Sequence, residues 1–288
     1  KGNDIDGNRF ISKAIEKGSK IIVSEQKIKD FRNGILFIRT KNIRKLLAEV
    51  SFKIYNKIPK NLVAVTGTNG KSSVAEFYLQ IMQLNKKKVA SIGTLGVKSK
   101  NINLNLFNTT TDPINLGQIL QKLKKEKVDN VIMEASSHGL KQYRLDGLNL
   151  KSGIFTNLSQ DHLDYHKNLK NYLKAKLYLF ENLIEKKGNI ITDKNIPQYK
   201  IIKKISLKKK LKLSTINEKQ NNFQILSHRY ENENQLIKIK YKDSIKEINL
   251  NLIGKIQIKN ILMAAIAAQK SNLNFDNILK VLPELKPV

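Results

Sequence analysis

From Leu62 onward, short runs of apolar residues alternate with amphipathic segments. Continuous apolar runs of four to six residues are typical of buried parallel strands, and apolar residues at every third or fourth position are typical of helices. Strands are therefore predicted at residues 62–65, 88–92, 128–133, 153–156 and 189–192, and helices at residues 74–82, 114–125, 169–184 and 256–269. This alternation predicts an α/β fold whose mostly parallel sheet is covered by helices on both faces.

Three segments have other patterns. Before residue 60 the pattern predicts a small α/β unit, with a helix at 10–14, strands at 20–24 and 35–38, and an amphipathic helix at 42–55; Pro59 marks the hinge that follows. Between residues 223 and 252, short alternating segments with Asn- and Asp-rich turns predict an antiparallel excursion. The lysine-rich run 203–212 is interpreted as an exposed loop or strand edge.

The composition narrows the classes of protein. A chain of 288 residues can form one large domain or two smaller ones with their own cores. It contains no cysteine, which excludes disulfides and thiolate metal sites and suits a reducing compartment, so a cytoplasmic location is expected. The sequence shows no apolar run long enough to span a bilayer and no signal peptide, so no membrane association is expected.

The formal charge of +29 is typical of nucleic-acid-binding proteins. However, the lysines are spread along nearly the whole chain together with abundant Asn and Ile, and no recognition helix, aromatic platform or zinc module accompanies them. A compositional bias with a solvated basic surface is the favoured explanation, and no nucleic-acid partner is expected. A nucleic-acid-binding ATPase remains an alternative that the charge alone suggests.

The stretch TGTNGKSS, residues 66–73, joins a predicted strand to a predicted helix. Its glycines let backbone N–H groups face an anion, and the helix N-terminus adds a partial positive charge. Lys71 would reach the outer phosphates of a nucleotide, and the Ser72 hydroxyl would lie on Mg²⁺. The strict Walker pattern is not met, because Val65 stands where its first glycine should be, and an ordinary turn is the alternative interpretation. The flanking strand and helix favour phosphate binding.

Glu134 directly follows a predicted buried strand, at the sheet edge where open parallel sheets bind ligands. A carboxylate there is costly unless a cation or hydrogen bonds satisfy it. The functional interpretation is a Mg²⁺ ligand facing the phosphate loop, and the alternative is an acid that caps a helix.

Three of the four histidines (His138, His162 and His166) follow within a short region. Two of them can be structural, but a histidine with two aspartates at the mouth of a sheet is better explained by a metal or phosphate pocket. In the next helix, Lys176 shares the predicted inward stripe, which is otherwise formed by Leu169, Tyr172, Leu173, Phe180 and Leu183. Such a lysine can extend to water, yet near a carboxylate, a histidine and a nucleotide it is a candidate for chemistry.

Five motifs resemble, in order, those of the Mur ligases. They are TGTNGKSS, NTTTDP at 108–113, MEASSHGLKQYR at 133–144, TNLSQDHLDYH at 156–166 and YLKAK at 172–176. The resemblance extends from about residue 1 to residue 285. The combination of SSHGL with DHLDYH resembles the member that adds the third residue of the peptidoglycan stem peptide, whereas the phosphate loop alone indicates only a Mur or folylpolyglutamate ligase.

The resemblance implies a P-loop-containing central ATP-binding domain at residues 60–288, preceded by part of a UDP-MurNAc-binding domain at residues 1–59. The family's C-terminal ligase domain is expected beyond Val288. The implied activity is an ATP-dependent ligation of a diamino acid to UDP-MurNAc-L-Ala-D-Glu through an acyl phosphate. meso-Diaminopimelate is the expected amino acid, and L-lysine or the acceptor of another Mur or polyglutamate ligase is the alternative. A nucleotide-binding module without ligase chemistry is a more distant alternative.

The resemblance also implies roles for individual residues. ATP would contact Gly67, Thr68, Asn69, Gly70, Lys71, Ser72, Ser73 and Asn260. One Mg²⁺ would be held by Ser72 and Glu134 and a second by His162, with Lys176 carbamylated by CO₂ to supply an anionic oxygen. Lys71, Lys176 and His162 form the implied catalytic set. The UDP-MurNAc-dipeptide would contact Asn108, Thr109, Thr110, Ser136, Gln142 and Arg144, with Arg144 neutralising an anionic group. Gln257 stands where the family usually has an Asn, which leaves an adenine contact there open.

Overall fold

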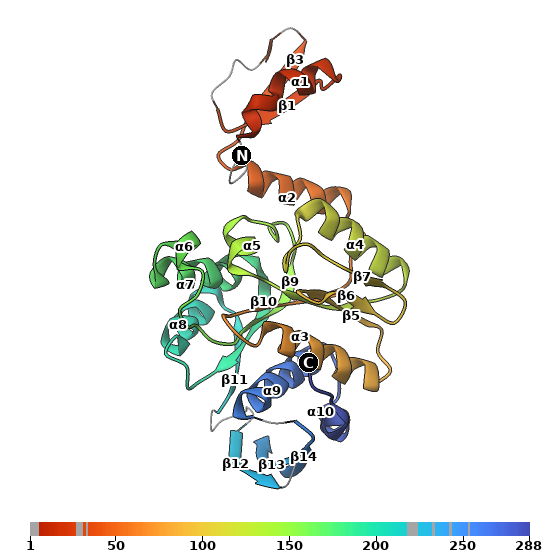
Figure 1. Ribbon diagram of the computed structural model, residues 1–288, viewed down its shortest axis with the longest axis vertical. Helices are drawn as coiled ribbons and strands as arrows, with labels where there is room; N and C mark the ends of the chain where they lie inside the picture. The colour runs from red at the N-terminus through yellow and green to blue at the C-terminus, as the bar shows by residue number, and fades with distance from the viewer. Residues whose placement is uncertain are drawn as a thin grey trace.

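The computed structural model describes residues 6–26, 31–32, 34–217, 224–231, 234–241, 244–252 and 254–288. Figure 1 shows a small unit at the top, a large sheet with helices above and below it in the middle, and a second small sheet at the bottom. The phosphate loop and the polar strand ends named above belong to the middle unit.

The small N-terminal unit agrees with its predicted pattern. Its elements are η1 (Gly7–Phe10), α1 (Ile11–Glu16), β1 (Ile21–Ser24), β2 (Phe31–Arg32), β3 (Ile35–Arg39) and α2 (Ile43–Ile54). β3 lies between β1, to which it is parallel, and β2, to which it is antiparallel. Asn42 caps α2 by accepting a hydrogen bond from the Lys45 backbone N–H at 3.0 Å.

The large sheet has the strand order β11-β10-β9-β4-β8-β5-β6-β7. Its strands are β4 (Asn61–Thr66), β5 (Val89–Gly93), β6 (Gly96–Ser99), β7 (Asn103–Leu104), β8 (Asn130–Glu134), β9 (Leu150–Phe155), β10 (Ile184–Asp193) and β11 (Lys212–Ile216). Pairing is parallel from β11 to β5 and antiparallel where β6 and β7 extend the edge. The mostly parallel α/β fold is therefore confirmed.

Helices cover both faces of this sheet, as the apolar runs require (Figure 1). Along β4, Leu62 and Ala64 belong to one hydrophobic cluster while Val63 and Val65 belong to the other, because successive side chains point to opposite faces. The first face carries α4 (Pro113–Lys125), α5 (Ser137–Lys141), α7 (Leu169–Tyr178) and α8 (Tyr199–Lys209), and the second carries α3 (Lys71–Leu84), α9 (Lys255–Lys270) and α10 (Phe275–Val281). Short α6 (Leu163–His166), the π-helical turn η2 (Leu179–Leu183) and η3 (Leu282–Glu284) complete the helices of the described residues.

The predicted antiparallel excursion is a three-stranded sheet of β12 (Gln224–Glu231), β13 (Asn234–Tyr241) and β14 (Ser244–Leu250). Ile237, Ile239 and Ile248 are buried in the hydrophobic cluster that contains α9. This packing attaches the small sheet to the side of the domain that carries α3 and α9. Phe223, the first residue of the predicted segment, lies outside the described residues.

Two expectations need correction. The lysine-rich run is helix α8 as far as Lys209, not a loop, and Ile202 and Ile205 are buried on its inner side; the run then enters β11 at Lys212, an outermost strand of the large sheet, so the strand-edge interpretation fits only the end of the run. Leu169 is 41% exposed and so does not belong to the inward stripe, and the predicted helix ends at η2 because Ile184 already begins β10. Within the described ranges, no helix combines the length and apolarity that crossing a bilayer requires.

Candidate functional site

The phosphate loop leads from the end of β4 into the first turn of α3. Gly67 has φ 152° and Gly70 has φ 83°, conformations that residues with a side chain rarely adopt. A Cβ on Gly67 would lie 1.8 Å from Oγ1 of Thr156, and one on Gly70 would lie 2.7 Å from Oδ1 of Asn260. Both glycines are therefore required by backbone shape and by close neighbours. Asn260, on α9, therefore lies against the loop.

The segment after β9 holds the loop from its other side. The Asn69 backbone N–H donates to Oδ1 of Asn157 at 3.0 Å, and the Asn69 carbonyl accepts from Oγ1 of Thr156 at 2.6 Å and from Nδ2 of Asn157 at 3.1 Å. Thr68 Oγ1 accepts from the Ser159 backbone N–H at 3.0 Å. These bonds fix the loop before any ligand contributes.

Lys71 lies over the loop that precedes it. Its ammonium donates to the carbonyl oxygens of Gly67 at 3.1 Å and Thr68 at 2.9 Å. Burial lowers the pKa of Lys71, and the negative charges of Glu134 and Asp161 oppose that shift. The side chain thus lies at the mouth of the loop, the position that phosphate oxygens would share.

Glu134 is the last residue of β8 and is 2% exposed. Its Oε2 accepts from Oγ of Ser72 at 3.1 Å and from Oγ1 of Thr94 at 3.2 Å, and its Oε1 accepts from the Thr94 backbone N–H at 2.8 Å. Ser136, not Glu134, caps α5, since its Oγ accepts from the Gly139 N–H at 3.0 Å. The helix-capping interpretation of Glu134 is therefore wrong.

The pair of Ser72 and Glu134 fits a magnesium ion chemically. A hydroxyl and a carboxylate oxygen already in contact are hard ligands of the kind Mg²⁺ prefers. Among the residues that the structure describes, no group of three or more His, Cys, Asp or Glu side chains could hold a metal ion. A magnesium ion here would thus take its remaining ligands from phosphates and water, as Mg²⁺ commonly does in nucleotide-binding proteins.

Lys176 is 1% exposed, so its inward position is confirmed. Its Nζ donates to the carbonyl oxygen of Gly67 at 2.7 Å and lies 4.2 Å from the centre of the Tyr172 ring. Burial, together with the positive charge of Lys71, lowers the pKa of Lys176 to about 7, against the opposing charge of Asp161. A substantial fraction of this amine is therefore neutral near neutral pH.

The three histidines differ in their surroundings. His166 is 1% exposed, its Nε2 lies 3.0 Å from Oγ of Ser137, and burial with nearby positive charges lowers its pKa to about 4, so it is a neutral structural residue. The half-exposed side chain of His162 lies with its ring centre 4.9 Å from that of His138 and 6.2 Å from that of Tyr172. His162 and Lys176 thus both contact the Tyr172 ring.

On the other side of Glu134, four of the expected acceptor-binding residues meet and form what we call the acceptor cluster: Thr110, Ser136, Gln142 and Arg144. Oγ1 of Thr110 donates to the backbone carbonyl of Glu134 at 2.8 Å and accepts from the Ser136 N–H at 2.9 Å. The Arg144 guanidinium donates to Oε1 of Gln142 through Nη2 at 2.8 Å and Nε at 3.1 Å, and also to the Thr110 carbonyl. Burial lowers the pKa of Arg144 from its ordinary value.

The loop before α4 carries the other two expected acceptor-binding residues, Asn108 and Thr109. Thr109 reaches the cluster, with its Oγ1 3.1 Å from Oγ1 of Thr94. Asn108 is exposed, beside the fully exposed ring of Phe107. The structure therefore brings together every expected acceptor-binding residue except Asn108, which lies on the outer side of the same loop.

Sequence reasoning missed Thr94 and Asn157. Each follows a strand of the parallel sheet, β5 and β9, so the rule that ligand sites gather beyond carboxyl strand ends could have found them. Their partners, Glu134 and Asn69, come from other strand ends and become neighbours only through the strand order.

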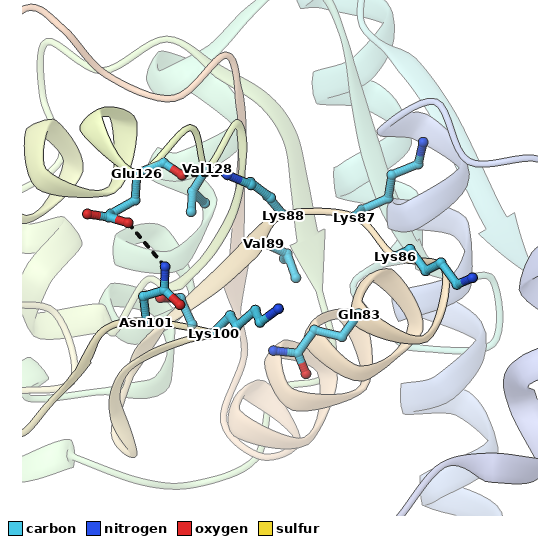
Figure 2. A pocket seen from close by; sticks show the side chains of 10 residues that line it. Gln83, Lys86, Lys87, Lys88, Val89, Lys100, Asn101, Glu126 and Val128 are labelled. Carbon is cyan, nitrogen blue, oxygen red and sulfur yellow. Dashed lines mark hydrogen bonds between the residues drawn. The ribbon is translucent and has the colours of Figure 1, made fainter.

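A separate hollow of about 570 Å³ lies at the opposite edge of the sheet, between the end of α3 and the start of β5 (Figure 2). Lys88 crosses it to donate to the Glu126 carbonyl at 3.1 Å, and Nδ2 of Asn101 donates to the Glu126 carboxylate at 3.2 Å. The hollow shares no residue with the phosphate loop and does not belong to the candidate site.

Comparison with known proteins agrees with this geometry. The model of the Mur ligase middle domain matches residues 65–268. A UDP-N-acetylmuramoyl-L-alanyl-D-glutamate–2,6-diaminopimelate ligase of Rickettsia bellii is 37% identical over 98% of this chain and 60% of its own length. The ligase of the same name from Zymomonas mobilis is 36% identical over all of this chain and 59% of its own.

Solved structures share the fold. A structure of a ligase of that name has a TM-score of 0.84 at 23% identity, over 97% of this chain and 57% of the other. MurF from Thermotoga maritima, in complex with ADP, has a TM-score of 0.65 at 17% identity, over all of this chain and 62% of the other. The mostly parallel α/β fold of this chain is thus shared with these solved structures. This chain belongs to the Mur ligase family. It spans about 60% of the length of the curated relatives that it matches.

Proposed function

We propose that this chain forms the ATP-binding and acceptor-binding part of a MurE-type ligase, which joins meso-diaminopimelate to UDP-MurNAc-L-Ala-D-Glu during peptidoglycan precursor synthesis in the cytoplasm. One observation carries the proposal. The side chain of Glu134 contacts Ser72 of the phosphate loop, while its backbone carbonyl contacts Thr110 of the acceptor cluster. A phosphate donor and a phosphate acceptor would therefore meet across a single residue, and the names of the relatives support this choice of reaction.

Residues 1–59 would belong to the UDP-MurNAc-binding domain and residues 60–288 to the ATP-binding domain. A carboxylate oxygen of D-Glu attacks the γ-phosphorus of ATP, and ADP leaves. The amine of the diamino acid then attacks the acyl carbon, phosphate leaves, and the nitrogen loses a proton. The chain contributes mainly by positioning the reactants and neutralising charge.

The residues of the phosphate loop have the first role in this proposal. Gly67 and Gly70 let the backbone approach the phosphates of ATP, with Thr68, Asn69, Ser72 and Ser73 beside them and Asn260 closing the loop. Lys71 would exchange its bonds to loop carbonyls for phosphate oxygens and offset the charge that develops during transfer.

The acceptor residues have the second role. Arg144 would offset an anionic group of the UDP-MurNAc-dipeptide, while Thr110 and Ser136 fix the loop beside Glu134. Thr109, Gln142 and Asn108 would complete the contacts.

Magnesium would be held by Ser72 and Glu134, and when bound it would supply positive charge to the phosphates. A second ion would be held by His162 and a carbamylated Lys176. A carbamate forms only from a neutral amine, and the lowered pKa of Lys176, about 7, supports that chemistry. Lys176 would then present anionic oxygens beside the loop instead of a cation.

The test uses the complete protein. Phosphate release from ATP is followed with UDP-MurNAc-L-Ala-D-Glu and with meso-diaminopimelate, L-lysine or no amino acid. We expect release that depends on the dipeptide substrate and on meso-diaminopimelate, and loss of that release in Lys71→Ala. Dependence on L-lysine would change the third substrate and leave the ligase chemistry intact. Absence of release with either amino acid, from a protein that still binds ATP, would overturn the proposal.

A further inference from the structure

A buried carboxylate stands at the end of β10, at the same carboxyl end of the parallel strands as the phosphate loop. Asp193 is the last residue of β10 and is 0% exposed. Its Oδ1 accepts from the Asn195 backbone N–H at 2.9 Å and from Nδ2 of Asn217 at 3.0 Å, and its Oδ2 lies 2.7 Å from Nζ of Lys259. One carboxylate therefore joins the loop after β10, the segment after β11 and helix α9.

Helix α9 packs against its neighbours through apolar contacts. Its buried residues include Ala264, Ala265, Ala267 and Ala268 together with larger ones such as Leu262, Met263 and Ile266, and apolar burial is non-directional. The helix begins after Gly254 without a side-chain cap. A charged pair adds a directional contact to these apolar ones, and so can help to fix the register of the helix along its axis.

The residue after Lys259 faces the phosphate loop. Asn260 is 4% exposed, and a Cβ on Gly70 would lie 2.7 Å from its Oδ1, so the loop and α9 touch without spare room. A shift of α9 by about one ångström would push Asn260 into the loop or withdraw it, and displacements of that size are enough to impair a ligand site.

We propose that Asp193 and Lys259 are positioning residues for the nucleotide: their ion pair holds α9 where Asn260 closes the phosphate loop. This inference rests on the proposed function, since it takes the loop to bind ATP. Both residues act through Asn260 and the loop.

The experiment measures ADP binding to the complete protein by calorimetry. Asp193→Asn and Lys259→Met are each expected to raise the Kd for ADP about tenfold, and the double variant should bind no more weakly than the weaker single variant, because the pair acts as a unit. Lys259→Arg, which keeps the charge, should bind nearly as wild type. Lys151→Met is the matched control: it breaks an ion pair with Glu185 at 3.2 Å, and its lysine side chain is 45% exposed against 40% for Lys259.

Kinetics separates positioning from a general loss of structure. We expect the KM for ATP to rise in both single variants while kcat and the KM for the acceptor stay near wild type. If Asp193→Asn fails to fold, the affinities of Lys259→Met and Lys259→Arg for ADP decide, because the Lys259 side chain is only partly buried. A folded single variant with wild-type affinity for ADP, or fully additive effects in the double variant, would overturn the inference. Failure of the wild type to bind ADP would instead overturn the proposed function, and this inference with it.

Discussion

The buried amine of Lys176 donates a hydrogen bond to the carbonyl oxygen of Gly67 at 2.7 Å, which ties α7 to the first glycine of the phosphate loop. Lys71 donates to the same carbonyl at 3.1 Å. The two lysines thus share one hydrogen-bond acceptor at the mouth of the site. Burial, followed by repulsion from Lys71, lowers the pKa of Lys176 to about 7.

Replacing Lys176 by Ala should lower turnover by the complete protein at least a thousandfold, because both the contact with the loop and the proposed anionic ligand are lost. High bicarbonate should not restore activity, since no amine remains to react with CO₂. Phosphate release with all substrates measures the effect. Lys174→Ala, two residues away on the exposed face of α7, is the control and should behave as wild type. Retained activity in Lys176→Ala would rule out the carbamate role.

Stability should depend on pH through the same lysine. The amine has a pKa of about 7 in the folded protein, below its ordinary 10.5, so between these values the unfolded chain binds more protons than the folded one. The free energy of unfolding of the wild type should therefore rise with pH relative to Lys176→Met, by up to about 1.4 kcal/mol per pH unit. Urea unfolding at pH 7, 8 and 9 in CO₂-free buffer tests this. Parallel profiles for the two proteins would contradict the lowered pKa.

Glu134→Gln keeps the shape of the side chain and an acceptor for the Thr94 N–H but removes the charge. Magnesium with ADP should then stabilise the protein much less, because Ser72 would be left with a neutral and weaker ligand partner. The measurement is the rise in Tm on adding Mg²⁺ and ADP, compared with the rise for ADP alone. Glu185→Gln, whose carboxylate pairs with Lys151, should respond as wild type. An equal Mg²⁺ effect in Glu134→Gln would exclude Glu134 as a ligand.

Arg144→Lys should raise the KM for UDP-MurNAc-L-Ala-D-Glu by about 10- to 100-fold and leave the KM for ATP within about twofold. A lysine cannot reproduce the planar fork of Arg144, which its bonds to Gln142 and Thr110 hold in place for an anionic group of the substrate, and losing a charged hydrogen bond to that group costs about 1.5–3 kcal/mol. Arg229→Lys, at an exposed position of β12, is the control. Steady-state kinetics with each substrate varied distinguishes the two KM values, and a matching rise in both would assign Arg144 a general structural role instead.

The sequence predicted best those parts of the site whose residues are contiguous along the chain. The phosphate loop, its strand and its helix are contiguous, so Gly67, Gly70, Lys71 and Ser72 could be recognised together. The inward direction of Lys176 was also predictable, because helical periodicity places it with Tyr172 and Phe180.

Contacts between distant strand ends could not be predicted in this way. The bonds from Thr94 to Glu134 and from Asn69 to Asn157 depend on β8 lying between β4 and β5, and on β9 lying beside β4. Periodicity gives the existence of these strands but not their order. Helix α8 was missed because its buried apolar residues are few, and because Ile201 and Leu207 lie exposed among the lysines, which hides the helical period.

Glu134 contributes to both halves of the site, through its side chain toward Ser72 and Thr94 and through its carbonyl toward Thr110. Any ligand that orders one side of this residue also restrains its peptide group, and so lowers the entropic cost of ordering the other side. Thermodynamic linkage makes such an effect reciprocal: the factor by which nucleotide tightens the acceptor is the factor by which the acceptor tightens nucleotide. Under the proposed function, a single buried residue would thereby give ATP and the UDP-MurNAc-dipeptide a route to synergistic binding.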